Sequence, residues 1–418
     1  MPGDTRVHPD ELRSRLTDLL VGSPMPKGRR MLGIEYERFL LDAEGRSAPT
    51  AFSIDLMRRL VDRLGAKAIA EGDLVKGLIA DEFDLSLEPG GQLEVAFPPF
   101  ERLSEVDRVM AKVDAELNAE LEGSGYNLHA FGCAPETRPD ELELLPRPRY
   151  GIMDREMVRR GDLSQWMMRA TAGFQITYDF ESAEDAATKI AMLYRLSPVF
   201  LATTANSRRA GGQDTGYASY RHHIWSRTDT DRSGVPDGCL HPSTAISGYV
   251  EYACKATVLF QERDGRIVEA EHISLQDLVA RGDVTEADLE LHLSSLFPHV
   301  RPRNYLEVRC FDGLPWSEAR SVIAWISGLV YCPHATKAAF ELSEEFAIDD
   351  PQELLALHER AAKQGLDAQL RPGRTLRDVA RELVRTSMAT LGGPSCDWAS
   401  TEDLQAVAAR VEAPVGTV

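Results

Sequence analysis

The sequence predicts an α+β fold, in which strands and helices are concentrated in different parts of one chain. Segments with strand-like alternation lie between residues 29 and 311. From residue 316 onward the apolar spacing is helical, and no regular βαβ alternation precedes it. Apolar residues make up 43% of the 418 residues, enough for a large core. We expect a mixed domain over residues 1–315 and a helical part, residues 316–418, packed on it.

Each expected element has a local signal. Apolar residues at helical spacing predict helices, and alternation bounded by turn residues predicts strands. Pro89-Gly90-Gly91 marks a hairpin turn, and Thr285 is the expected N-cap of a helix ending near residue 297. The expected helices are 9–20, 52–64, 103–121, 182–201 and 285–297; the expected strands are 29–41, 126–132, 173–180 and 304–311, with 84–97 as a hairpin. Residues 135–150 and 210–238 are expected loops.

Charge and composition exclude several classes of function. The chain has 47 Lys and Arg against 66 Asp and Glu, a net charge of −19, which argues against nucleic-acid binding and docking to anionic membranes. No apolar segment is long enough to span a bilayer, and residues 1–15 lack the apolar core of a signal peptide. Six scattered cysteines without CxxC spacing predict neither a disulfide scaffold, a redox-switch disulfide nor a structural zinc site. We expect a cytoplasmic enzyme.

Four strand segments each carry a polar face rich in carboxylates. Alternation places Glu35 with Glu37, Gln92 with Glu94, and Glu307 with Arg309 on shared faces, and Gln175 lies on the polar face of a fourth strand. Ordinary solvated strand faces are the alternative for any one segment. Such faces favour Thr, Lys and Ser, however, and lysine is absent here. The shared pattern favours faces that converge on one cavity.

Converging carboxylates require cations. Two carboxylates about 5 Å apart repel by roughly 3 kcal/mol at an effective dielectric constant near 20. Oxygen-only ligands prefer Mg²⁺ or Mn²⁺ to zinc, and several such ions beside an arginine suit nucleotide phosphates. The chain has no Walker loop, and Gly123-Ser124-Gly125 lacks the third glycine of a dinucleotide motif. If ATP binds, metal bridges rather than a phosphate loop must hold it.

These segments resemble the glutamate–cysteine ligase family, in its plant-type and bacterial branch that includes the ergothioneine-pathway ligases. The run Leu87-Glu88-Pro89-Gly90-Gly91-Gln92 and the later His223-Ile224-Trp225 form the most specific part of the match. The matching segments are 33–37, 86–94, 167–175, 205–207, 221–225, 229–234, 296–298 and 305–309, in that order. The resemblance implies a fold like glutamine synthetase, with a curved antiparallel sheet forming a funnel and helices packed outside.

The resemblance also implies a reaction and its residues. ATP phosphorylates the γ-carboxylate of L-glutamate, and the amino group of L-cysteine then displaces phosphate. Residues 1–315 would be the catalytic ligase domain, with two or more Mg²⁺ ions that Mn²⁺ can replace. The implied metal ligands are Glu35, Glu37, Glu88, Glu94 and Glu307; the catalytic residues are Arg309 and Glu37; the ATP-binding residues are Gln175, Arg303, Arg309 and Asp231; and the substrate-binding residues are Arg221, Thr171, Met168 and Trp225.

Several alternatives stay open at this stage. Arg309 could form a plain ion pair, Arg221 could lie on the surface, and Trp225 could belong to the core. His222 and His223 would point opposite ways on a strand, so at least one is structural. Near the site, Ala96-Phe97 and residues 310–313 depart from the pattern of many relatives, so another amine could be the acceptor. A catalytically inactive binding protein is a third hypothesis. We expect a monomer or homodimer without nucleic-acid or membrane partners.

Overall fold

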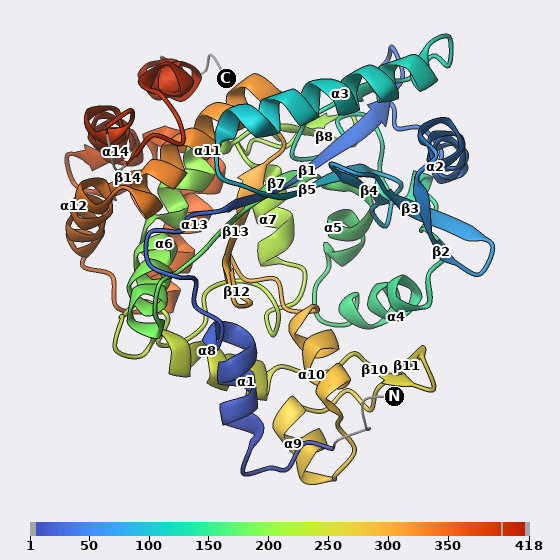
Figure 1. The fold of residues 1–418 in the computed structure, drawn as a ribbon, viewed down its shortest axis with the longest axis horizontal. Coiled ribbons are helices and arrows are strands. Elements are labelled where there is room, and N and C mark those ends of the chain that lie inside the picture. The colour runs from blue at the N-terminus through green and yellow to red at the C-terminus, as the bar shows by residue number, and fades with distance from the viewer. Residues whose placement is uncertain (1–5, 394–395, 414–418) are drawn as a thin grey trace.

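One antiparallel sheet forms the centre of the molecule. The computed structural model describes residues 6–393 and 396–413, and within them the largest sheet has nine strands. Eight follow the order β12-β13-β7-β1-β5-β4-β3-β2, and β6 pairs with β1 (Figure 1). The strands are β1 (Leu32–Leu41), β2 (Lys67–Glu71), β3 (Leu74–Ile79), β4 (Asp84–Leu87), β5 (Leu93–Phe100), β6 (Asn127–His129), β7 (Gly173–Tyr178), β12 (Val300–Pro302) and β13 (Leu306–Asp312).

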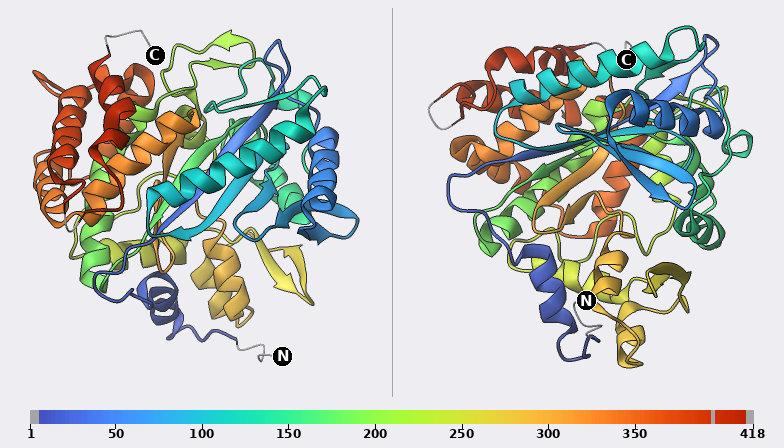
Figure 2. Two further views of the ribbon diagram at one scale, coloured as in Figure 1. Left: turned by 45° about the horizontal axis from the view of Figure 1, so that its top comes forward. Right: turned by 45° about the vertical axis from the view of Figure 1, so that its right-hand side comes forward.

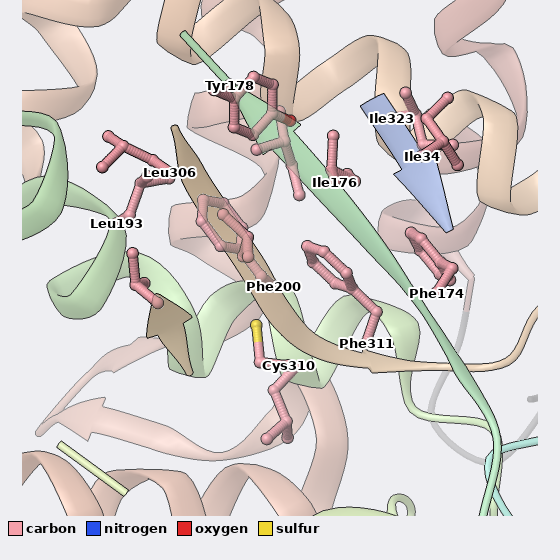
Figure 3. Close-up of a cluster of buried hydrophobic side chains, with 14 of the residues drawn as sticks. Ile34, Phe174, Ile176, Tyr178, Leu193, Phe200, Leu306, Cys310, Phe311 and Ile323 are labelled. Carbon is pink, nitrogen blue, oxygen red and sulfur yellow. The ribbon is translucent and has the colours of Figure 1, made fainter. Parts of the chain in front are cut away.

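One face of this sheet, which we call the outer face, supports the core. Ile34, Ile176 and Val308 pair across β1, β7 and β13, so their side chains project to the same side. They are fully or nearly fully buried with residues of α6 (Ala183–Thr204) and α11 (Trp316–Tyr331), as Figure 3 shows for Phe200 and Ile323. Burial of this face fixes the register, because a one-residue slip would expose every one of these side chains.

The remaining helices surround the sheet on several sides. α2 (Thr50–Leu64) contacts β3, and α3 (Leu103–Leu121) crosses β5, as Figure 2 shows for the long helix over the strands. The other helices are α1 (Leu12–Val21), α4 (Pro148–Met157), α5 (Ser164–Ala170), α7 (Tyr220–Ser226), α8 (Ala245–Lys255), α9 (Leu275–Ala280), α10 (Glu286–Leu293), α12 (Pro333–Glu344), α13 (Pro351–Gln364), α14 (Leu376–Thr390) and α15 (Gln405–Glu412). Short hairpins are β8–β9 (Arg209–Ala210, Gln213–Asp214), β10–β11 (Phe260–Arg263, Arg266–Glu269) and β14–β15 (Gln369–Arg371, Arg374–Thr375).

The structure confirms the α+β class and most of the expected elements. The helix over 103–121, the hairpin over 84–97 and the Thr285 cap, whose hydroxyl accepts from Asp288 N–H, all occur. The expected loop over 210–238 is wrong in part, because it contains the short helix α7, capped by Ser219. His222 and His223 therefore lie on a helix rather than a strand. The β2–β3 hairpin was not expected, since its short strands carry few buried residues.

The cysteines differ from expectation at one pair. Cys332, at the end of α11, is joined by a disulfide to Cys396, and their Cα atoms are 5.6 Å apart despite a sequence separation of 64. Spacing along the chain could not indicate this contact, because packing of distant segments creates it. Cys133, Cys239, Cys254 and Cys310 are free and buried. Across the described residues, no helix has the length and hydropathy needed to cross a bilayer.

Candidate functional site

The opposite face of the sheet, the inner face, carries the predicted carboxylates. Residues that pair directly across antiparallel strands project to the same side. Glu35 pairs with Gln175, Glu37 with Glu94, and Glu307 with both Arg301 and Thr177. Successive odd-numbered positions of β1 share this side, which links the three pairs into one row. Four segments that are distant in sequence thus present polar side chains to one region, as the alternation predicted.

Three of these carboxylates have almost no partner in the protein. Glu94 accepts one hydrogen bond from the Ser86 hydroxyl at 2.9 Å. Within the described chain, the carboxylates of Glu35 and Glu88 take part in no hydrogen bond or ion pair. Burial, together with neighbouring carboxylates, raises the pKa of Glu35 and of Glu88 to about 7 and that of Glu94 well above its ordinary value. None of these three acids therefore forms an ion pair within the described chain.

Glu37 is held in place by two donors. Its carboxylate accepts from the Gly173 backbone N–H at 2.6 Å and from the Gln175 side-chain amide at 2.7 Å. The amide oxygen of Gln175 is buried and has no donor in the described chain. A buried oxygen without a donor calls for an unseen partner such as water or a cation. Gln175 and Glu37 thus present oxygens beside the unpaired carboxylates.

Glu307 differs from the other acids because two arginines flank it. One carboxylate oxygen accepts from Arg301 Nε at 2.6 Å, and the other accepts from Arg309 Nη1. Although burial alone would raise the pKa of Glu307, Arg301 and Arg309 hold it at about 2. Burial alone would lower the pKa of Arg309, but Glu307, Glu35 and Glu37 raise it above its ordinary value. The ion pair predicted as an alternative for Arg309 exists, and it places the guanidinium among Glu35, Glu37 and Glu307.

Two adjoining cavities lie along the inner face. The first, the carboxylate cavity, has a volume of about 230 Å³ and is lined by Glu37, Glu88, Pro89, Gln92, Arg147, Arg149, Tyr150, Met153, Met167, Met168, Thr171, Arg221, Trp225, Phe297 and Arg309. The second, the histidine cavity, has a volume of about 360 Å³ and includes His222, His299 and Cys310. Arg221, Trp225, Phe297 and Arg309 line both cavities, so they form the wall between them. Two molecules, one bound in each cavity, would both contact these four residues.

Arg221 has the environment of a ligand-binding arginine. It is 5% exposed, lies over the Trp225 ring at 5.6 Å and has no carboxylate partner in the described chain. Its backbone N–H donates to the Ser207 hydroxyl, which donates in turn to Asp312. A Cβ at Gly173 would lie 2.5 Å from the Phe311 carbonyl oxygen and 2.8 Å from Arg221 Nη2, so the close approach of the Phe311 backbone requires glycine beside Arg221. The surface alternative for Arg221 is therefore wrong.

The structure brings some predicted residues to the cavities and leaves others outside. Thr171 and Met168 line the carboxylate cavity, and the Thr171 hydroxyl donates to the Met167 carbonyl. Asp231 instead accepts hydrogen bonds from Arg160 and Thr257. Among the residues that the structure describes, neither Asp231 nor Arg303, in the turn between β12 and β13, lines either cavity. Their predicted contact with ATP stays a prediction.

Sequence reasoning missed several polar residues of the site. Arg301 lies on a three-residue strand, too short to show alternation. Arg147 and Arg149 lie in a segment expected to be a loop, although Pro148 marks the first residue of α4. Asp312 was noted only as a departure from relatives, yet it accepts from Asn206, Ser207 and Ser219. Pro148, as a helix-start signal, is the one cue that could have located an arginine at the site.

The donor atoms on the inner face suit hard divalent cations. Its donors are carboxylate and amide oxygens, which Mg²⁺ and Mn²⁺ prefer. Three ligand atoms within 4.8 Å of one another occur, among residues 6–393 and 396–413, only at Glu156, Glu269 and His272 on another part of the molecule. The inner-face carboxylates therefore do not enclose a single point, and of the five predicted metal ligands only Glu37 and Glu88 line a cavity, whereas Glu35, Glu94 and Glu307 line neither of the two. Glu35, Glu37, Glu88 and Glu94, with Gln175, would hold such ions.

The histidine cavity has a different character. His222 and His299 line it, and the ring of His299 stacks on His358 with centroids 4.4 Å apart. Burial lowers the pKa of His299 to about 4 and that of His222 well below its ordinary value. These rings are neutral near pH 7 and add no positive charge to the cavity. The positive charge at the wall comes from Arg221 and Arg309.

Unpaired carboxylates on one face of an antiparallel sheet, beside cavity-lining arginines, suit a ligase that binds metal ions and phosphate groups. The chain belongs to the glutamate–cysteine ligase family 2 (GCS2), whose model matches residues 31–407. It is similar to the chloroplastic glutamate–cysteine ligase A of Oryza sativa subsp. indica, at 30% identity over 89% of this chain and 76% of the relative. The chloroplastic glutamate–cysteine ligase of Brassica juncea is 29% identical over 89% of this chain and 73% of the relative.

A solved structure shares the fold. Glutamate–cysteine ligase from Francisella tularensis, in complex with AMP, matches 93% of this chain and 82% of its own, with a TM-score of 0.55 and 11% identity. At this identity the likeness concerns the fold alone. It confirms the funnel-type architecture that the resemblance implied, and the family match confirms that the chain is a glutamate–cysteine ligase enzyme.

Proposed function

We propose that the chain forms γ-glutamylcysteine from L-glutamate and L-cysteine with cleavage of ATP to ADP and phosphate. A γ-carboxylate oxygen attacks the terminal phosphorus of ATP, and the bond to ADP breaks. The cysteine nitrogen then attacks the acyl carbon of γ-glutamyl phosphate, phosphate leaves, and the nitrogen loses a proton. The relatives named above, and the AMP in the Francisella complex, support this choice of substrates.

One observation carries the proposal. Glu35, Glu88 and Glu94 are partly buried and form no ion pair in the described chain, although the charge of Arg309 acts on Glu35 and Glu88. A protein tolerates such unpaired charge at a functional site when a ligand supplies the opposite charge. Magnesium bound there would neutralise the triphosphate and the γ-carboxylate. A folded scaffold without such a ligand would have paired or replaced these acids.

The chain's own residues supply binding and orientation. Arg221 binds the α-carboxylate of glutamate through its planar guanidinium, with Thr171, Met168 and Trp225 around the side chain. Arg309 neutralises the transferring phosphoryl group. Glu307 fixes Arg309 and is itself fixed by Arg301, so this positive charge needs little reorganisation during the reaction. Trp225 and Phe297 form an apolar wall that limits access of water to the acyl phosphate.

A second candidate is the same activation of glutamate with another amine. The histidine cavity, at about 360 Å³, is larger than the carboxylate cavity, at about 230 Å³, and meets it at the Arg221–Arg309 wall. Its volume leaves space for an acceptor larger than cysteine. Of the departures from relatives, Cys310 lines the histidine cavity, whereas Phe97 packs against Trp316 in the core. This observation favours testing acceptors beyond cysteine.

The test is an acceptor screen with the full chain. Protein with Mg²⁺, ATP and L-glutamate is given cysteine or one of a panel of amines, and phosphate release is measured with mass spectrometry of the product. We expect γ-glutamylcysteine, and a kcat/KM for cysteine orders of magnitude above that of other amines. A different preferred amine would establish the second candidate. No phosphate release with any amine would exclude both and leave a binding protein.

The pathway and setting form part of the proposal. γ-Glutamylcysteine would enter thiol biosynthesis, for glutathione or ergothioneine. The net charge of −19 supports action away from anionic membranes and nucleic acids, and we propose a cytoplasmic monomer or homodimer. Light scattering during size-exclusion chromatography measures the oligomeric state directly.

A further inference from the structure

Asp312, the last residue of β13, is a buried acid that the reaction as described does not use. It is 1% exposed, and one of its carboxylate oxygens accepts from the Asn206 backbone N–H at 2.8 Å and from the Ser207 hydroxyl at 2.6 Å. The other oxygen accepts from the Ser219 hydroxyl at 2.8 Å. A Cβ at Gly132 would lie 2.5 Å from its Cγ, so glycine there leaves space for the carboxylate. Asp312 thus joins β13 to segments that are distant in sequence.

A bulge in β13 turns Asp312 toward the site. β13 and β7 keep one register as far as Val308 and another from Phe311 onward, so β13 contains one extra residue between them. Asp312 pairs with Gly173 on the inner face, whereas strict alternation from Glu307 would have turned it to the outer face. The bulge therefore brings this carboxylate to the side of the sheet that carries the site.

The two serines that bind Asp312 also cap helix α7. The Ser219 hydroxyl accepts from the His222 backbone N–H at 3.2 Å, and the Ser207 hydroxyl accepts from the Arg221 backbone N–H at 3.0 Å. The Ser207 carbonyl accepts from the first N–H of the helix at 3.3 Å. These three N–H groups have no partner within a helix, so the two serines satisfy them from outside. Both hydroxyl hydrogens then go to Asp312.

This arrangement favours the ionised form of Asp312. Each serine oxygen already accepts a backbone N–H, so its single hydrogen needs an acceptor. A proton on the carboxylate would compete with one of these hydrogens for the same oxygen. Burial raises the pKa of Asp312 above its ordinary value, although Arg221 and the three donors act against this effect. The negative charge lies, through the serines, at the N-terminus of α7, where the helix dipole favours it.

The helix held in this way carries part of the wall between the two cavities. α7 lies beside β13 and supplies Arg221 and Trp225 to the wall, while β13 itself supplies Arg309 (Figure 1). The Arg221 N–H is one of the capped groups, so a shift of the cap moves the Arg221 backbone directly. The contact of Asp312 with the serines therefore fixes where one arginine lies relative to the other.

We propose that Asp312 is the positioning residue of the glutamate site, which holds α7 through Ser207 and Ser219 so that Arg221 meets the α-carboxylate. This rests on the proposed function, in which Arg221 binds glutamate. Asp312 touches no substrate and acts through the Arg221 backbone. Because β13 also carries Arg309, one strand sets the distance between the glutamate end and the phosphoryl end of the reaction.

The alternative is a role in stability alone. The same hydrogen bonds tie the chain after α6 and the start of α7 to the sheet, so their loss would destabilise any protein with this fold. Under that alternative, the melting temperature falls and the affinities for glutamate and ATP are kept or fall together. Under the proposal, the loss of affinity is selective for glutamate and requires the Arg221 side chain.

The experiment compares Asp312→Asn, Ser207→Ala and Ser219→Ala with wild type, each alone and combined with Arg221→Gln. Asn keeps the size of the side chain but places an NH₂ group where one hydroxyl donates. For every variant we measure kcat, the KM of L-glutamate and of ATP, glutamate binding by calorimetry, the melting temperature, and hydrogen exchange of the peptide that contains α7.

Ser274→Ala is the matched control. Ser274 caps α9, and its hydroxyl donates to Asp277 at 2.6 Å while accepting the Asp277 backbone N–H at 3.2 Å. The local chemistry is therefore the same as at α7, but the position is exposed and lines neither cavity in the described chain. This control shows what loss of a serine cap does away from the site.

We expect Asp312→Asn to raise the KM and the dissociation constant of glutamate about tenfold, while the KM of ATP changes by less than about twofold. Ser207→Ala and Ser219→Ala change the same quantities in the same direction by less, and exchange in α7 becomes faster in all three variants. With Arg221→Gln present, these substitutions weaken glutamate binding little further, because residues that act as a unit are not additive. Ser274→Ala lowers only the melting temperature.

Two results overturn the proposal. One is a lower melting temperature for Asp312→Asn with the KM of glutamate and of ATP both unchanged or raised equally. The other is a loss of glutamate affinity that adds in full to that of Arg221→Gln. If Asp312→Asn does not fold, Ser207→Ala and Ser219→Ala decide by the same two criteria. Wild type that neither binds glutamate nor releases phosphate would end the proposed function itself, whereas failure of the Asp312 proposal alone leaves wild-type binding intact.

Discussion

Replacing Glu35 with glutamine tests whether the inner face is built for a missing positive charge. Glutamine has nearly the same shape as glutamate but carries no charge. Burial and the nearby Glu307 raise the pKa of Glu35 from 4.5 to about 7. Between these values the folded protein keeps a proton that the unfolded chain has released. The contribution of Glu35 to the free energy of unfolding therefore falls as pH rises from about 4.5 to about 7.

The magnitude follows from this change in pKa. A rise from 4.5 to about 7 corresponds to a loss of about 3 kcal/mol once the pH exceeds the folded-state value. In metal-free solution at pH 8, we therefore expect Glu35→Gln to be more stable than wild type by about 3 kcal/mol. At pH 5 the side chain is protonated in the folded wild type, so the difference shrinks. Excess Mg²⁺ at pH 8 stabilises wild type more than the variant.

The measured quantity must be the difference in free energy of unfolding between wild type and variant, because buried histidines change stability with pH in the opposite direction. Burial lowers the pKa of His292 and of His299 to about 4. Between about pH 4 and 6.5 the unfolded chain binds protons that the folded protein does not, so these groups reduce stability as pH falls. They contribute equally to wild type and variant and cancel in the difference.

Urea unfolding followed by tryptophan fluorescence, in EDTA at pH 5 and pH 8 and then with Mg²⁺, gives the required free energies. Glu122→Gln is the matched control, because it makes the same change of side chain at an exposed position at the end of α3. A Glu35→Gln variant that is equally stable as, or less stable than, wild type at pH 8 without divalent ions would refute the reasoning.

Three further predictions concern activity. Glu37→Gln removes a carboxylate that accepts hydrogen bonds from Gly173 N–H and the Gln175 amide, and it should lower kcat about a hundredfold or more in a phosphate-release assay. Glu122→Gln should leave kcat unchanged. Equal turnover by Glu37→Gln and wild type would show that Glu37 is not part of the site. Arg221→Gln should raise the KM of glutamate about ten- to a hundredfold while the KM of ATP changes little, and the opposite split would reassign Arg221. Gly173→Ala places a Cβ 2.5 Å from the Phe311 carbonyl oxygen and 2.8 Å from Arg221 Nη2, so both melting temperature and glutamate affinity should fall. A fall in melting temperature with unchanged glutamate affinity would show that Arg221 can move aside.

The sequence predicted the row of carboxylates because alternation in a strand is a local rule. Glu35, Glu37, Glu94 and Glu307 needed only a shared face, and the sheet register supplied it. The sequence did not predict which of these acids would form an ion pair with an arginine. Glu307 is held by Arg301 from a three-residue strand, whereas Glu35 is left unpaired, and only the order of strands decides which acid lies beside an arginine.

Helical elements near the site were harder to predict. The seven residues of α7 give fewer than two turns of periodicity, so His222 and His223 appeared to belong to an extended segment. The disulfide between Cys332 and Cys396 and the cavity position of Arg149 depend on contacts between distant segments. Local patterns do not contain that information. The division at residue 315 stays a prediction, since core residues on both sides of it belong to one continuous cluster.

The order of strands in the sheet has a consequence for biosynthesis. During translation, β1, β4 and β5 leave the ribosome with their acidic side chains long before β12 and β13 bring Arg301 and Arg309. Until β7 has paired with both β1 and β13, the early strands face one another without the positive charges that flank Glu307. The inner face of a newly made chain is therefore complete only after these late segments arrive.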